Sequence, residues 1–242
     1  MNTIKQLFWK QFSIYGFSTI LVRSVSFLLL PLYTKYFSTY QTGYIYLLFT
    51  FLAFVQVFYN FGTDSSFLKF MSQKKDLDSN IFNSSVIGLF FTSLLLSLSL
   101  IVFSNYISNF YLGISEPTWI LLCSLILFFD TICGRIMSFF RLGNKAFFYA
   151  LVSILNVIIV IGFNIYFVVF KGIGVDGVLY GTLIGSVVRF FCIIPIIFFK
   201  ISFKKFKIDI YKRLVVFGIP FFPSAIFYII MEMADRKILH LL

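Results

Sequence analysis

The chain has 242 residues, of which 60% are hydrophobic and only 12% charged, and it carries a formal net charge of +11. A soluble domain has roughly twice that share of charged residues, so the polar side chains are too few to cover a surface that faces water. The basic residues fall in short clusters between long apolar runs, whereas nucleic-acid-binding proteins gather theirs on a solvated face. We therefore expect membrane lipid, and no nucleic acid, as a partner.

Seven apolar stretches are long enough to cross a bilayer, since about 20 helical residues span a hydrocarbon layer of about 30 Å. They cover residues 12–32, 43–61, 81–103, 119–140, 147–170, 177–199 and 214–233. Each is a continuous apolar run, unlike the short alternating segments of a membrane β-barrel. The sequence therefore predicts an all-α integral membrane protein with about seven transmembrane helices.

Lysine and arginine near the ends of the spans indicate the orientation, because cytoplasmic loops carry an excess of both. The opposite loops hold only Lys35 and Lys171, joined by Arg236 and Lys237 if the tail lies on that side. Thirteen others share the side of the amino terminus: Lys5, Lys10, Lys69, Lys74, Lys75, Arg141, Lys145, Lys200, Lys204, Lys205, Lys207, Lys212 and Arg213. This asymmetry predicts a multi-pass protein with a cytoplasmic amino terminus.

Arg23, Asp130 and Arg189 lie near the middle of their predicted spans, at one common depth. An isolated charge there costs at least about 2.5–3.5 kcal/mol, so each should face a partner or a hydrated cavity. In the structural interpretation, Asp130 simply neutralises one arginine. Because one aspartate cannot pair fully with two arginines, we predict a cationic cavity between helices that attracts an anionic group.

Uncharged polar residues recur at helical spacing in other spans. Gln56, Asn60 and Asp64 form one stripe, and Asn156 belongs to another. Either they line the cavity or they bond helix to helix. Arg135 lies five residues from the predicted cytoplasmic end of its span, so it either snorkels to that surface or joins the cavity.

Small residues and prolines mark close contacts and bends. Gly177, Gly181 and Gly185 form a double small-xxx-small pattern, which predicts a close helix contact. Pro220 and Pro223 remove backbone donors from the seventh span, so we expect that span to bend.

The sequence lacks the common motifs of nucleotide-hydrolysing enzymes and metalloproteases. It contains no G-x-x-x-x-G-K-[ST] and no H-E-x-x-H, and Cys123, Cys133, Cys192 and His240 lack the spacing of metal ligands. We expect neither an enzyme nor a metal or cofactor site.

Five segments, read together, resemble one family over nearly the whole chain. They are RSVSFLLLPLYTKYFSTYQTG at 23–43, FGTDSSFLKF at 61–70, RLGNKAFFYA at 141–150, GIGVDGVLYGTLIG at 172–185, and FGIPFFPSA at 217–225 followed by ADRKIL at 234–239. Their order and spacing are similar to those of the polysaccharide exporters and lipid-linked oligosaccharide flippases of the multidrug, oligosaccharidyl-lipid and polysaccharide exporter superfamily.

The resemblance implies two six-helix bundles that rock about a central cavity. Residues 1–213 would form the amino-terminal bundle, and residues 214–242 the first helix of a second bundle whose remainder lies outside this chain. The implied activity is the flipping of a polyprenyl-diphosphate-linked oligosaccharide across a bacterial plasma (inner) membrane, for a cell-surface polysaccharide such as the O-antigen of lipopolysaccharide. Polysaccharide polymerase and assembly proteins are the implied protein partners.

Under this hypothesis Arg23, with Arg189 as second choice, attracts the diphosphate, and the other polar residues meet sugar hydroxyls or shape the field. The expected substrate-binding residues are Arg23, Arg189, Asp130, Gln56, Asn60, Asn156 and Arg135. One alternative is a cation-coupled drug exporter of the same superfamily, which should have a mainly acidic cavity. Another is a non-transporting scaffold or transferase of polysaccharide assembly.

Overall fold

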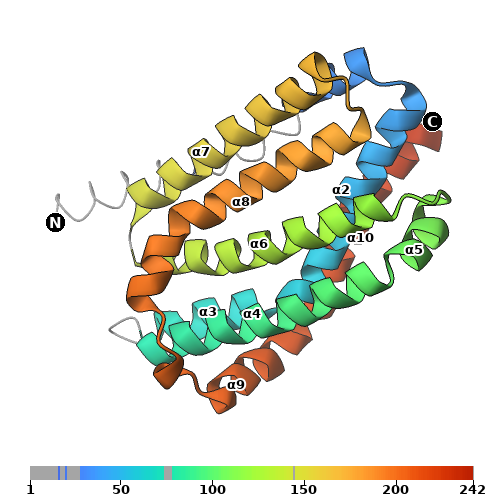
Figure 1. Ribbon diagram of the computed structural model, residues 1–242. Coiled ribbons are helices and arrows are strands. Elements are labelled where there is room, and N and C mark those ends of the chain that lie inside the picture. The colour runs from blue at the N-terminus through green and yellow to red at the C-terminus, as the bar shows by residue number, and fades with distance from the viewer. Residues whose placement is uncertain (1–15, 17–19, 21–27, 74–77, 144, 242) are drawn as a thin grey trace.

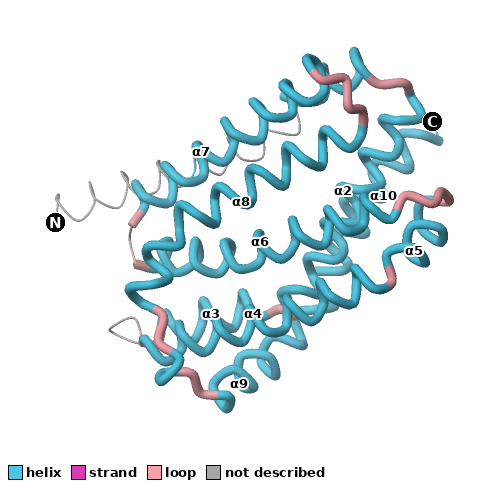
Figure 2. Tube along the Cα trace, in the orientation of Figure 1, coloured by secondary structure: helices cyan, strands magenta, loops and turns pink. Residues whose placement is uncertain are grey.

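The computed structural model describes residues 16, 20, 28–73, 78–143 and 145–241. Arg23 and most of the first predicted span lie outside these residues. Every regular element in the described part of the chain is helical (Figure 2). The predicted all-α fold class is confirmed, as expected where lipid leaves the backbone no partners except its own helical hydrogen bonds.

Six described helical stretches are long and apolar enough to cross a membrane, and they match the second to seventh predicted spans. They are α2 (Thr39–Asn60), α4 (Ser79–Val102), α6 (Pro117–Leu142), α7 (Ala146–Ile165) with its π-helical end η2 (Tyr166–Phe170), α8 (Val175–Lys200), and α9 (Ile208–Gly218) continued through the 3-10 turn η4 (Ile219–Phe221) into α10 (Phe222–Leu241). The shorter elements are α3 (Thr63–Ser72), α5 (Ser104–Ile107), the π-helical turn η1 (Ser108–Leu112) and the 3-10 turn η3 (Phe203–Lys205).

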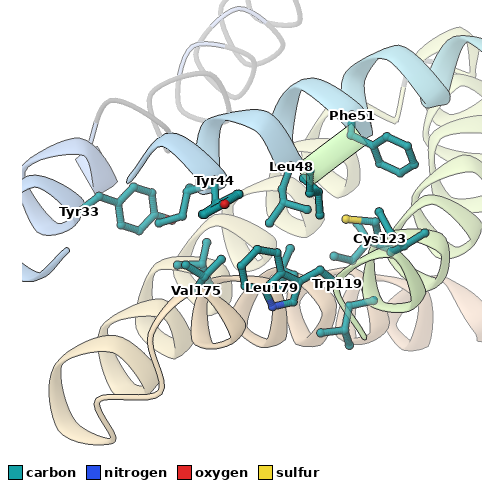
Figure 3. Packing of buried hydrophobic residues seen from close by; sticks show 14 of the residues in the cluster. Tyr33, Tyr44, Leu48, Phe51, Trp119, Cys123, Val175 and Leu179 are labelled. Atoms are coloured by element: carbon teal, nitrogen blue, oxygen red, sulfur yellow. The ribbon is translucent and has the colours of Figure 1, made fainter. Parts of the chain in front are cut away.

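The helices α7, α8, α6 and α4 lie side by side in that order (Figure 1). Helix α2 packs on α6 and α10, and α9 packs on α3 and α4. One buried cluster joins α2, α6 and α8 through Leu48, Trp119 and Leu179 (Figure 3). Trp119 also donates a hydrogen bond from Nε1 to Asp176 Oδ1 at 2.7 Å. The helices on which the candidate polar residues lie are therefore packed directly against one another.

The three glycines at four-residue spacing on α8 lie against α7. A Cβ added to Gly177 would lie 3.0 Å from Phe167 Cβ, one on Gly181 would lie 2.7 Å from Asn164 Nδ2, and one on Gly185 would lie 2.3 Å from a Val160 methyl group. All three positions therefore face the neighbouring helix. The predicted close helix contact is confirmed.

Gly181→Ala is expected to lower the free energy of unfolding by about 1–3 kcal/mol, as overpacking typically does. The new methyl group would also lie 2.9 Å from the backbone nitrogen of Asn164, which cannot move aside freely. Gly162→Ala, on α7, is the control, because nothing lies within 4 Å of its added Cβ. Thermal unfolding in detergent should show a lower midpoint for the first variant and an unchanged or slightly higher one for the second. Equal midpoints would contradict this description of the contact.

The seventh span begins at Ile208, earlier than predicted, and it is interrupted where proline predicted a bend. Tyr211, Leu214 and Gly218 form the buried face of α9, while Lys212 and Arg213 point outward. Their charges gave the first turns the appearance of a loop in the sequence. Pro220 lies inside η4, the turn that separates α9 from α10. The α-helix is therefore interrupted at the first of the two prolines, and the predicted bend of the span stays a prediction.

The connection between α8 and α9 is tied to the beginning of α4. The backbone nitrogen of Ser202 donates to Asn83 Oδ1 at 2.6 Å, and that of Lys207 donates to Ser84 Oγ at 2.9 Å. The ring of Tyr211 lies on Gly88, where an added Cβ would come within 2.2 Å of it. These contacts fix the start of α9 on α4.

Candidate functional site

Asp130 and Arg189 meet between α6 and α8. Arg189 Nη2 donates to Asp130 Oδ1 at 2.5 Å. Their side chains are 20% (Arg189) and 33% (Asp130) exposed, so helix packing leaves part of the pair uncovered. Arg189 Nε is buried and has no hydrogen-bond partner among the described residues. The structure thus brings two of the predicted site residues together, and the guanidinium retains an unused donor.

Asn156, on α7, contacts α8 about one helical turn before Arg189. A Cβ added to Gly185 would be 3.2 Å from Asn156 Oδ1, and Gly185 precedes Arg189 by about one helical turn, which places them on one side of α8. Asn156 Oδ1 is buried and has no partner in the described part of the chain. A buried amide oxygen without a hydrogen bond is uncommon and calls for a donor. A ligand hydroxyl or a water molecule would supply one.

Gln56, on α2, contacts the segment of α6 that contains Asp130. Its Nε2 donates to Thr131 Oγ1 at 3.0 Å, and that hydroxyl donates onward to the Leu127 carbonyl at 2.7 Å. Thr131 follows Asp130 directly in sequence, so their side chains point about 100° apart around the helix. Gln56 is therefore near Asp130 along α6 but on a different face.

Arg135 is buried deep in the protein, with an exposed fraction of 1%. Its Nη1 donates to the Thr63 carbonyl at 2.8 Å, and its Nη2 donates to Thr63 Oγ1 at 2.6 Å and lies 3.2 Å from Asp64 Oδ1. The guanidinium also lies 4.9 Å from the Phe67 ring centroid. Arg135 neither snorkels to a surface nor is accessible to a substrate in this arrangement, so both expectations for its side chain are corrected here.

The stripe of Gln56, Asn60 and Asp64 does not lie on one continuous helix. α2 ends at Asn60, and the next two residues, Phe61 and Gly62, have φ values of 45° and 66° in the left-handed region. Asp64 therefore belongs to α3, a helix that the sequence did not predict. Asn60 is partly exposed beside this break, and its carbonyl accepts a hydrogen bond from Thr63 Oγ1 at 2.6 Å.

Despite the break, both helices reach one face of α6. Gln56 meets Thr131, and Asp64 meets Arg135, four residues further along α6. Two threonines, Thr63 and Thr131, complete these contacts, and neither was predicted from the sequence. Thr131 carries a usable signal, because it is one turn before Arg135 on a helix that must satisfy a buried charge. Thr63 had only the weak signal of following a glycine.

The arrangement combines a partly exposed guanidinium, the carboxylate that pairs with it, and a nearby amide oxygen on α7. The guanidinium Nε and the amide oxygen have no hydrogen-bond partner among the described residues, and a guanidinium is a strong donor to anions. Within the described ranges, no three His, Cys, Asp or Glu side chains come together as a metal site would require.

A family model described as "Polysaccharide biosynthesis protein" matches residues 8–242 of the sequence. No curated protein matches the sequence of this chain. Among solved structures, a MOP superfamily transporter from Pyrococcus furiosus is similar with a TM-score of 0.70 and 16% identity, over 89% of this chain and 52% of that one.

Two MATE structures are similar as well. One is in complex with MaD3S, with a TM-score of 0.66, 18% identity, and coverage of 89% of this chain and 53% of that one. The other is in the straight conformation, with a TM-score of 0.67, 18% identity, and coverage of 89% and 52%. At such identities the likeness concerns the fold. The chain spans about half the length of these solved transporters.

Proposed function

Because the chain belongs to the polysaccharide biosynthesis protein family, we propose that it flips a polyprenyl-diphosphate-linked oligosaccharide across a membrane as part of a two-bundle transporter. The observation that supports this best is the Arg189–Asp130 pair, a partly exposed charge pair within membrane-spanning helices. A diphosphate and its sugars cannot cross hydrocarbon unaided, because each loses its hydration there. A cation with a spare donor at this depth replaces part of that hydration.

In the proposed cycle Asp130 serves as the internal counter-ion of Arg189. Nε is buried in this arrangement, so the guanidinium must turn before a phosphate oxygen can accept a hydrogen bond from it. Full engagement then transfers Nη2 from the carboxylate to the phosphate, since charge-assisted bonds from arginine suit both anions. Gln56, Asn60 and Asn156 supply donors and acceptors for sugar hydroxyls, and the prenyl chain stays in the lipid. The function proposed is transport, not catalysis.

The proposal extends to the surroundings of the site. Residues 1–213 would form one bundle, and residues 214–242 would begin the second, with the rest of the cavity wall supplied by the half that this chain does not match. Arg23, outside the described residues, would add a second cation. The protein would lie in a bacterial inner membrane with its amino terminus in the cytoplasm, beside the polymerase and assembly proteins of an O-antigen-type polysaccharide.

Flipping can be measured in proteoliposomes made with the intact gene product and a fluorescent polyprenyl-diphosphate oligosaccharide, by the fraction of label that an impermeant quencher reaches over time. Arg189→Ala should slow flipping at least about tenfold, the loss expected from one charge-assisted bond. Arg189→Lys should retain part of the rate. Arg141→Ala, an exposed arginine at the end of α6, is the charge-matched control and should leave the rate unchanged. Undiminished flipping in both Arg23→Ala and Arg189→Ala would refute the assignment.

The MATE likeness makes a cation-coupled drug exporter the second candidate. In that function Asp130 would be the essential group, because it can bind a cation or a proton. Asp130→Asn would then abolish drug efflux from proteoliposomes, and Arg189→Gln would preserve it. The flippase proposal predicts the reverse order of severity with the lipid-linked substrate.

A further inference from the structure

An apolar groove of about 660 Å³ lies on the side of α9, away from the Asp130–Arg189 pair. Its lining residues come from α3, α9 and η4: Phe70, Lys212, Arg213, Val216, Phe217, Pro220 and Phe221. Five of the seven are apolar, and the other two are cations. None of them belongs to the candidate substrate site.

Two of the lining residues, Lys212 and Arg213, are cations that follow one another on α9. Lys212 and Arg213 are both exposed, and neither takes part in an ion pair within the described part of the chain. A third cation borders the groove, since Lys69 Nζ lies 4.2 Å from the centroid of the Phe217 ring. Asp209, in the first turn of α9, is the nearest acidic residue along that helix. The described residues that line and border the groove therefore carry a net positive charge.

The positions along the helix match the depth of a lipid. The membrane-spanning stretch begins at Ile208, so Lys212 and Arg213 lie in its first two turns. Phe221 follows Arg213 by eight residues, which corresponds to about 12 Å of further depth. Basic residues at the interface followed by an apolar channel complement a phosphate head group followed by an acyl chain.

We propose that this groove binds an anionic membrane phospholipid, with its phosphate at Lys212 and Arg213 and one acyl chain along Phe217 and Phe221. The lining contains no uncharged polar side chain that could meet sugar hydroxyls, which favours an ordinary phospholipid over a lipid-linked oligosaccharide. The groove shares no residue with the proposed substrate site.

The test introduces a reporter into the groove itself. Phe217→Trp in the intact protein is mixed, in detergent micelles, with brominated phosphatidylglycerol or brominated phosphatidylcholine, both of which quench tryptophan on contact. The signal of the unsubstituted protein is subtracted, because it contains two other tryptophans. We expect half-maximal quenching at a roughly 20-fold lower concentration of the anionic lipid, since each of the two basic residues near the surface contributes about a fivefold factor. Phe191→Trp, exposed on α8, reports general lipid contact and should show no preference.

Charge variants complete the test. Lys212→Gln with Arg213→Gln should abolish the preference at Phe217→Trp, while the matched pair Lys35→Gln with Lys171→Gln should leave it intact. Equal quenching by both lipids would overturn the proposal. Protection of Phe217→Trp from both lipids would also overturn it, because the groove would then be covered by protein, either a second copy or a further segment.

Discussion

Gly62→Ala is expected to lower the free energy of unfolding by about 2–5 kcal/mol, one of the two largest effects foreseen for a single substitution. Gly62 has a φ of 66° and lies directly against the interruption of the seventh span. An added Cβ would lie 2.2 Å from the carbonyl oxygen of Gly218, an atom of the backbone that no side-chain rotation can displace. The midpoint of thermal unfolding in detergent should fall accordingly, and the contact between the two interruptions should open.

Gly113→Ala separates the two contributions to that loss. Gly113 has nearly the same backbone conformation, with a φ of 69°, but nothing lies within 4 Å of its added Cβ. It should therefore show only the backbone penalty, about 1 kcal/mol. Gly218→Ala approaches the contact from the other side, where its Cβ would lie 2.8 Å from the Phe61 carbonyl oxygen. Because Gly218 has a φ of -75°, this variant should show the contact penalty without the backbone penalty. Similar midpoints for Gly62→Ala and Gly113→Ala would mean that the two backbones do not touch.

Arg135→Ala is expected to destabilise the protein by about 3–5 kcal/mol. The variant leaves the Thr63 carbonyl without its donor and creates a void where one of the largest fully buried side chains had been. Asp64, whose side chain is 47% exposed, would still reach water. The loss should therefore come mainly from the orphaned backbone group and the void. Thermal or denaturant unfolding in detergent measures it.

Two companion variants identify the cause. Arg135→Met fills most of the void without restoring the hydrogen bonds, so it should recover part of the stability. Asp64→Asn removes one charge but leaves both bonds to Thr63, so it should be milder than Arg135→Ala. If Asp64→Asn proved as damaging as Arg135→Ala, the ion pair rather than the Thr63 contacts would hold the interruption between α2 and α3.

The fold was predictable to the extent that long apolar runs determine it. Six predicted spans match described helices, because a bilayer leaves the backbone few choices over such lengths. Helix α3 was missed, since its sequence TDSSFLKFMS is short and mixed in polarity. The left-handed Phe61 was also beyond reach, because nothing in an apolar run marks a single non-glycine residue with positive φ.

The sequence predicted the depth of the candidate site residues in the membrane, but not which residues contact one another. Counting along the spans placed Asp130 and Arg189 at one level, and they are paired. The same counting failed for Arg135, because its partner Thr63 follows an interruption that the sequence does not mark. Which residue neutralises which depends on the rotation of each helix about its axis. That rotation is decided by packing such as the glycine contact between α7 and α8.

The hydrogen bonds from Ser202 and Lys207 hold the connection between the sixth and seventh spans against the first turns of α4. A flexible connection would let the seventh span move independently of α4. The hydrogen bonds from two backbone amides to Asn83 and Ser84 instead couple the start of the seventh span to α4. Any tilt of α9 would therefore displace the amino-terminal end of α4 as well. The 3-10 turn at Ile219–Phe221 then separates α10 from the part of the span that is bonded to α4.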